Sequence, residues 1–131
     1  MKLIGMNAIV VDDDPDITGV FSELLTLHGV DVIGIGHNGF DAIRLFSEKS
    51  PMLVFLDVHM PQLDGITALK KIKELSAQVK VIMVTGDLSS DLEKILESNG
   101  ANAIIFKPFS IDEITYVINE IQTSDKMITR L

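Results

Sequence analysis

The sequence predicts an α/β protein with one parallel sheet of five strands and helices on both faces of that sheet. Five short runs rich in Val and Ile alternate with segments whose apolar residues recur every three or four positions. Five strand–helix repeats favour a doubly wound parallel sheet, because each connecting helix packs back onto the sheet. Signals that start or stop helices lie between the two kinds of segment.

The five strands are predicted from short runs of β-branched and other apolar residues. The third and fourth runs are almost entirely apolar, which is typical of strands buried on both faces. The second run contains a charged residue and Gly34, which suits a strand at the edge of the sheet. The runs are Ala8–Val11, Asp31–Ile35, Leu53–Leu56, Val79–Val84 and Ala103–Phe106.

A helix is predicted after each strand, from an apolar stripe with helical spacing. We expect residues 1–122 to form one domain and residues 123–131 to be a C-terminal tail or an extension of the last helix. The stripes run from Ile17 to Leu25, from Ala42 to Phe46, from Ile66 to Leu75, from Leu88 to Leu96 and from Ile111 to Ile121.

Capping signals mark several of the predicted helix ends. Asp14-Pro15 offers a capping carboxylate followed by a proline for the first turn. Ser90-x-x-Glu93 and Ser110-x-x-Glu113 each fit a capping box, in which a serine and a glutamate satisfy free backbone N–H groups. Gly29 and Gly100 lie where two of the helices should stop.

Composition excludes several kinds of site and partner. The chain of 131 residues has no cysteine, so it has no disulfide, no thiolate metal site and no cysteine nucleophile. Its net charge of −8 argues against direct binding to nucleic acid, which requires a basic surface. No run approaches the roughly 20 apolar residues of a membrane span. We therefore expect a soluble cytoplasmic protein that binds neither nucleic acid nor membrane.

Polar residues follow four of the predicted strands and meet at one edge of the sheet. Carboxylates of Asp12-Asp13-Asp14 and of Asp57 follow the first and third strands, Thr85-Gly86 follows the fourth and Lys107-Pro108 follows the fifth. In open α/β sheets, ligands bind beyond the carboxyl ends of the strands. Two carboxylates about 4 Å apart repel by roughly 4 kcal/mol at an effective dielectric of 20. Such a cluster implies a bound cation, a perturbed pKa, or both.

The residue types at this edge point to phosphoryl chemistry. Carboxylate oxygens without His or Cys ligands select Mg²⁺ or Mn²⁺, which usually bind phosphate as well. An aspartate beside the metal can attack phosphorus and form a covalent intermediate. Lys107 and Thr85 supply a positive charge and a hydroxyl for the phosphoryl oxygens, and Gly86 leaves room beside the backbone.

Five motifs, in their order and spacing, resemble the response-regulator receiver domain of two-component signalling, in the form of a chemotaxis-regulator-like single domain. The resemblance covers residues 5 to 122 and implies a flavodoxin-like (βα)₅ fold with strand order 2-1-3-4-5. The motifs are Val10-Val11-Asp12-Asp13, Asn38-Gly39-x-Asp41-Ala42, Asp57-x-x-Met60-Pro61-x-x-Asp64-Gly65, Val84-Thr85-Gly86 and Lys107-Pro108-Phe109.

The resemblance implies a magnesium-dependent phosphoacceptor site. Asp57 would be the phosphoacceptor, and Asp13 and Asp57 would bind Mg²⁺ directly, with the backbone carbonyl of His59 as the third protein ligand. Asp12 would act mainly through metal-bound water, whereas Asp14 fits a helix cap better than a ligand.

The resemblance also assigns the residues that hold and sense the phosphoryl group. Thr85 and Lys107 would hold its oxygens, and the Lys107-Pro108 peptide bond would be cis. The family usually has Tyr or Phe three residues before its lysine, and this aromatic side chain swings inward when the threonine moves. Ile104 occupies that position, so the threonine–aromatic switch is in doubt, and Phe106, on the same strand face, is a candidate substitute.

Two further positions are candidates for tuning the lifetime of the phosphoryl group. His59 and Asp87 each lie two residues after a strand-end residue of the site. In the family, these positions flank the path of the water that hydrolyses the phosphoryl group. The alternative is that both are exposed loop residues without a kinetic role.

The sequence predicts a signalling receiver that is not an enzyme acting on a separate substrate, although it promotes its own phosphorylation and dephosphorylation. A histidine kinase or phosphotransfer protein would donate the phosphoryl group, and a target would bind the surface from Ser89 to Ile121. One alternative is a receiver cut from a longer regulator with a DNA-binding or enzymatic output, which the length of the native reading frame decides. Another is a metal-dependent aspartyl phosphatase, but the common class needs an aspartate where this chain has His59.

Overall fold

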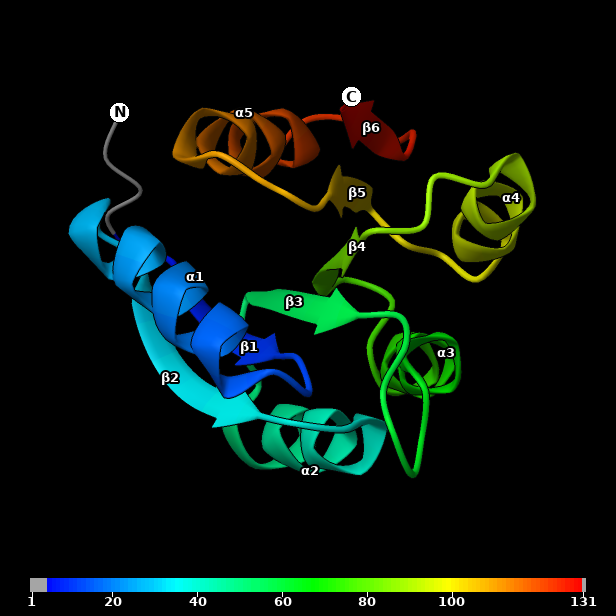
Figure 1. The fold of residues 1–131 in the computed structure, drawn as a ribbon, viewed down its shortest axis with the longest axis horizontal. Helices are drawn as coiled ribbons and strands as arrows, with labels where there is room; N and C mark the ends of the chain where they lie inside the picture. Colours follow the sequence, from blue (N-terminus) through cyan, green and yellow to red (C-terminus); the bar gives the residue numbers. More distant parts are fainter. Residues whose placement is uncertain (1–4, 131) are drawn as a thin grey trace.

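The structure, a computed structural model, describes residues 5–130 and contains a single parallel sheet. The strand order is β2-β1-β3-β4-β5-β6, so the first five strands have the predicted order (Figure 1). All five strand pairs are parallel. The strands are β1 (Asn7–Val11), β2 (Asp31–Gly36), β3 (Leu53–Asp57), β4 (Lys80–Thr85), β5 (Ala103–Phe106) and β6 (Ile128–Arg130).

Five helices cover the two faces of the sheet in separate layers (Figure 1). They are α1 (Pro15–Leu27), α2 (Gly39–Lys49), α3 (Gly65–Leu75), α4 (Ser90–Ser98) and α5 (Ile111–Ile121). Buried side chains of α2, α3 and α4 form one core cluster with the sheet, and those of α1 and α5 form the other. None of the helices between residues 5 and 130 combines the length and the apolar character that crossing a membrane requires.

Alternation along the strands divides the core between the two layers. In β5, Ile104 and Phe106 face the α2–α3–α4 layer, whereas Ala103 and Ile105 face the α1–α5 layer. The same alternation holds in β3 and β4, whose residues are almost all fully buried, as predicted for the two central apolar runs. The strand with Gly34, β2, lies at the edge, also as predicted.

Most of the predicted caps are present, and one is displaced by a residue. The carboxylate of Asp14 accepts the N–H of Asp16 at the start of α1, and Ser110 accepts the N–H of Glu113 at the start of α5. The cap of α4 is Ser89, which accepts the N–H of Leu92, so the capping box predicted at Ser90 was wrong by one position. Ser89 and Ser90 are adjacent and either could cap the helix, so the tertiary fold decides which serine does.

The C-terminal segment departs from the prediction. Residues 123–131 were expected to be a tail or a helix extension, but Ile128–Arg130 form a sixth strand, β6, parallel to β5. The sheet therefore has six strands rather than five, and β6 lies next to β5 between α4 and α5 (Figure 1). The three-residue run Ile-Thr-Arg is too short for its β-branched residues to distinguish a strand from a tail.

Candidate functional site

Three carboxylates meet at the carboxyl edge of the sheet. One oxygen from each of Asp12, Asp13 and Asp57 lies within 4.8 Å of the other two. Asp57 is the last residue of β3, and Asp12 directly follows β1, the strand beside it. Asp12 and Asp57 are buried, whereas Asp13 is exposed. The predicted cluster is therefore present, with one member open to solvent.

A single ammonium group balances part of this negative charge. Nζ of Lys107 donates a hydrogen bond to Oδ2 of Asp12 at 2.7 Å and lies 3.6 Å from Oδ1 of Asp57. Lys107 directly follows β5, so its side chain reaches across the end of β4 to the ends of β1 and β3. The other oxygen of Asp12 accepts the N–H of Asp14, which fixes the orientation of that carboxylate.

Burial makes Asp57 reluctant to ionise. Desolvation and the negative charge of Asp12 raise the pKa of Asp57 from its ordinary value of 3.8 to about 6, with a smaller contribution from Asp13. Lys107 and the backbone hydrogen bond of Val58 lower this pKa but do not reverse the change. Asp57 is thus a carboxylate at neutral pH, but one that gains from any added positive charge.

The pKa of Lys107 is also raised, which for a lysine favours the charged form. Burial alone lowers the pKa of Lys107, but the hydrogen bond to Asp12 and the charges of Asp57 and Asp12 outweigh it and raise that pKa. Lys107 therefore stays protonated, as the role predicted for it, holding phosphoryl oxygens, requires.

Thr85 lies at the end of β4 and is held from both sides. Its carbonyl oxygen accepts the N–H of Lys107 at 2.8 Å, and its side-chain oxygen accepts the N–H of Asp87 at 3.1 Å. The residue is almost fully buried, with 1% of its surface exposed. The ends of β4 and β5 are therefore tied together at the two residues predicted to hold the phosphoryl group.

Gly65 fixes the loop that follows Asp57, a role that the sequence alone did not reveal. A Cβ atom at this position would overlap the carbonyl oxygen of Asp57. The N–H of Gly65 also donates to the carbonyl of Val58 at 2.8 Å, which holds the start of α3 against the end of β3. The Asp64-Gly65 motif was the available signal, because glycine is required where backbones approach this closely.

His59 and Asp87 form a pair at the rim of the site. Nε2 of His59 lies 3.6 Å from Oδ2 of Asp87, and their side chains are 70% and 39% exposed. The backbone N–H of Ser89 and then its side chain lower the pKa of Asp87, and His59 adds to this effect. Each residue was expected beside the site, but their contact with each other was not.

The remaining predicted residues lie close to the site without joining the cluster. The Lys107-Pro108 peptide bond is cis, as the resemblance implied. Ile104 is buried in the α2–α3–α4 layer together with Phe106, so these two residues do share a strand face. Asp14 caps α1 and does not belong to the carboxylate cluster.

The donor set suits a hard divalent cation. Three carboxylates, two of them buried, supply oxygen ligands of the kind that Mg²⁺ and Mn²⁺ prefer. A single lysine cannot neutralise all three charges, so a cation with two positive charges relieves the repulsion that raises the pKa of Asp57. The residues present therefore fit a magnesium site.

Comparison with known proteins identifies relatives over nearly the whole chain. The family model described as "Response regulator receiver domain" matches residues 8–119. The chain is 37% identical over 114 residues to the chemotaxis protein CheY of Bacillus subtilis, covering 86% of this chain and 93% of that protein. It is 32% identical to the probable C4-dicarboxylate response regulator DctR of the same organism, but it spans only 50% of that longer protein.

Solved structures give the same result for the fold. CheY in the CheX–CheY–BeF₃–Mg complex from Borrelia burgdorferi superposes with a TM-score of 0.88 at 26% identity, and 92% of each chain is covered. A DNA-binding response regulator of the LuxR family from Staphylococcus aureus superposes with a TM-score of 0.84 at 28% identity, covering 90% of this chain.

Proposed function

This chain belongs to the response regulator receiver domain family, and we propose from that premise that it is switched by phosphorylation of Asp57. The observation that carries the proposal is the position of Asp57. It is a buried carboxylate at a strand end, with two further carboxylates and one ammonium group in reach. The donor would be a histidine kinase or a phosphotransfer protein, consistent with the family.

The reaction is a transfer of the phosphoryl group to a carboxylate oxygen. An oxygen of Asp57 attacks phosphorus, the bond between phosphorus and the donor's imidazole nitrogen breaks, and the electron pair stays on the imidazole. Asp57 must be ionised to attack, and a pKa of about 6 leaves it ionised at neutral pH. The product is an aspartyl phosphate, whose phosphoryl group carries about −1.5 to −2 charges in place of the single charge of the carboxylate.

Residues around Asp57 have separate roles in this proposal. Asp13, Asp57 and the backbone carbonyl of His59 would hold Mg²⁺ directly, and Asp12 would hold it through water. When bound, the ion supplies positive charge beside the phosphoryl oxygens. Lys107 would exchange its contact with Asp12 for one with the phosphoryl group, because the new group carries more charge close to Nζ.

The hydroxyl of Thr85 would donate to another phosphoryl oxygen. In the present structure its oxygen accepts the N–H of Asp87, so its hydrogen is free to point elsewhere. His59 and Asp87 would set the lifetime of the aspartyl phosphate, because each lies two residues after a residue of the site and the two side chains contact each other there. The protein thus promotes its own phosphorylation and dephosphorylation without acting on a separate substrate.

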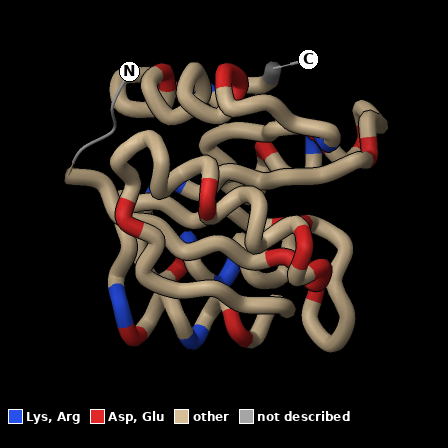
Figure 2. The backbone as a smooth tube through the Cα atoms, turned by 60° about the vertical axis from the view of Figure 1, so that its left-hand side comes forward, with Lys and Arg blue, Asp and Glu red and all other residues tan. Residues whose placement is uncertain are grey.

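The surface of α4, β5 and α5, from Ser89 to Ile121, would bind the target. It combines exposed apolar side chains with a strong negative charge. Ile95 on α4 and Tyr116 on α5 are 43% and 41% exposed. Together, the sequences of α4 and α5 contain six acidic residues and one lysine. Figure 2 shows the acidic positions along α5 at the top of the view. The expected target therefore carries a positively charged binding segment.

Mass measurement tests the phosphoacceptor directly. The chain is incubated with acetyl phosphate and Mg²⁺, and its intact mass is recorded. One phosphoryl group should be added, and both EDTA and the substitution Asp57→Asn should abolish the addition. Labelling that persists in Asp57→Asn would show that another residue accepts the group. The aspartyl phosphatase alternative predicts turnover of a generic phosphate ester, which a receiver lacks.

A further inference from the structure

The sixth strand lies on the surface that the proposed function assigns to target binding. β6 pairs with β5 through Ala103–Ile128, Ile104–Thr129 and Ile105–Arg130. It thereby covers the edge of β5 between α4 and α5 (Figure 1). Backbone N–H and C=O groups on that edge, which a partner strand would otherwise reach, are occupied by the chain itself.

β6 is held at both faces of the sheet by adjacent residues. Met127 packs against the α2–α3–α4 layer and Ile128 against the α1–α5 layer, in keeping with the alternation of a strand. The N–H of Ile128 donates to the carbonyl of Asn102 at 3.0 Å. The hydroxyl of Thr129 donates to the carboxylate of Glu93 on α4, in a long bond of 3.4 Å.

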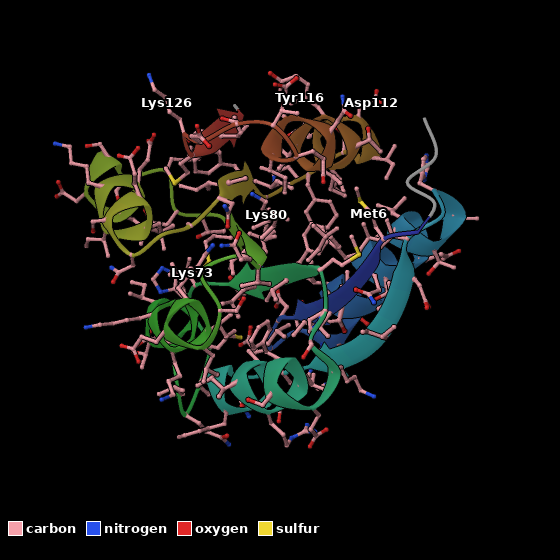
Figure 3. All side chains as sticks on the ribbon, turned by 180° about the vertical axis from the view of Figure 1, so that it is seen from behind. Met6, Lys73, Lys80, Asp112, Tyr116 and Lys126 are labelled. Carbon is pink, nitrogen blue, oxygen red and sulfur yellow. The ribbon has the colours of Figure 1, made fainter. Side chains whose placement is uncertain are left out.

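Asn102 connects the start of β6 to the rest of the fold. Its side-chain oxygen accepts the ammonium group of Lys73 at 2.7 Å and the N–H of Val81 at 2.9 Å. Lys73, seen beside Lys80 in Figure 3, also donates to the carbonyl of Val79, so the side of Asn102 that faces α3 and β4 is rigid. At its first residue β6 is thus attached to a network of hydrogen bonds around Asn102, and beyond that residue it is attached by pairing with β5 and by one long side-chain bond.

The rest of β6 has the features of an element that opens easily. It is three residues long, it lies at the edge of the described sheet with a partner strand on one side, and its Ile128 and Thr129 side chains are half-buried. Lys126, at the turn into β6, points away from the body of the protein (Figure 3). Short elements with few buried contacts and exposed hydrogen bonds are the first to open in native proteins.

β5 links this strand to the phosphorylation site. Lys107 directly follows β5, and its N–H bonds to the carbonyl of Thr85. Ile104 pairs with Met83 of β4 on one side and with Thr129 of β6 on the other. A movement of Thr85 and Lys107 toward a phosphoryl group therefore shifts the strand on which β6 depends.

We propose that β6 is a strap over the target-binding surface, and that phosphorylation of Asp57 releases it. The inference rests on the proposed function and adds its regulation. In the resting state, the edge of β5 is closed by residues of the same chain; in the phosphorylated state, it is open to the target. Coupling between the two sites is reciprocal, so loosening β6 favours phosphorylation and fixing β6 opposes it.

Hydrogen–deuterium exchange on the full chain tests the release. Exchange is measured by mass spectrometry before and after incubation with acetyl phosphate and Mg²⁺, and the intact mass of each sample gives its phosphorylated fraction. Peptides covering residues 122–131 should exchange faster in the phosphorylated chain, while peptides from β3 should not. Unchanged exchange in a phosphorylated sample would overturn the strap alone. A sample that takes no phosphoryl group would overturn the proposed function, and with it the control of the strap.

A disulfide lock tests the reciprocal effect. Ala103 and Ile128 are cross-strand partners on the same face, neighbouring strands lie within disulfide range, and the chain has no cysteine of its own. If β6 is a strap, chains with β6 open are the ones that react readily, so in Ala103→Cys/Ile128→Cys oxidation, which removes that population, should lower the rate of phosphorylation by acetyl phosphate at least about 5-fold. Reduction of the same sample should restore the rate, and each single variant controls for the cysteines.

The opposite change loosens the strap. Ile128→Pro removes the N–H that bonds to Asn102 and should raise the rate of phosphorylation. Equal rates in the oxidised, reduced and proline forms would show that β6 is a passive cover of the sheet edge. Exchange on the unmodified chain decides the question even where a variant fails to fold.

Discussion

Neutralising Asp57 should stabilise the metal-free protein at neutral pH, although it removes the phosphoacceptor. The pKa of Asp57 rises from 3.8 to about 6 in the folded chain, so ionisation is harder in the folded state than in the unfolded one. At 1.36 kcal/mol per pKa unit, this difference corresponds to about 3 kcal/mol. The value already includes the attraction of Lys107, because that charge is among the causes of the pKa.

The sign follows from the direction of the pKa. Below 3.8, Asp57 is protonated in both states and its burial carries no charge penalty. Between pH 3.8 and about 6, the unfolded chain ionises Asp57 while the folded chain keeps it protonated, so the free energy of unfolding falls across this window by about 3 kcal/mol in total. Asp57→Asn keeps the shape of the side chain and cannot ionise, so it does not share this loss.

Urea denaturation in EDTA measures the effect. The free energy of unfolding of Asp57→Asn should match that of the parent near pH 3 and exceed it by about 3 kcal/mol near pH 7.5. Asp14→Asn, which changes an exposed helix cap, controls for the loss of one negative charge. A gain that is the same at both pH values, or a loss at pH 7.5, would refute the argument. Mg²⁺ should stabilise the parent more than the variant, because a ligand stabilises the state that binds it.

Two further substitutions test the metal site and the loop beside it. Asp13→Ala should weaken Mg²⁺ binding, measured by calorimetry, far more than Asp14→Ala, since only Asp13 belongs to the carboxylate cluster; equal effects would mean that the acidic run is misassigned. Gly65→Ala should cost about 1–3 kcal/mol of stability, because the added methyl overlaps the carbonyl of Asp57. Gly19→Ala, in an open position on α1, should instead gain about 1 kcal/mol, and a similar loss in both variants would contradict the role of Gly65.

The order of the elements and the position of the site were predictable because both depend on local patterns. Short apolar runs rich in Val and Ile predicted the strands, and the carboxyl ends of parallel strands necessarily share an edge, so Asp57 and Lys107 had to approach each other. The pairing within the cluster was not predictable. Lys107 bonds to Asp12 at 2.7 Å and lies farther from Asp57, at 3.6 Å. This preference depends on side-chain geometry, which the spacing of residues in the sequence does not reveal.

The features missed by sequence depend on contacts between distant segments. β6 exists because the edge of β5 and two core layers are available to Met127 and Ile128, not because its own three residues demand a strand. The contact between His59 and Asp87 joins two loops whose relative position is set by the whole sheet. Tertiary context, rather than local propensity, decides such cases.

Because Ile104 stands where the family usually has an aromatic residue, the strap that we propose gives β6 a place in signal transmission that the family pattern does not provide. An aromatic switch works because a large ring rotates between an exposed and a buried position. Ile104 is already buried, with 1% of its surface exposed, and its branched side chain is restricted at χ1. In the proposed mechanism, a signal that leaves Thr85 would then travel through the backbone of β5 rather than through a rotating ring. β6 pairs with that backbone, and its Thr129 bonds to Glu93 on α4. In this proposal β6 therefore connects β5 to the target-binding surface in place of the aromatic ring.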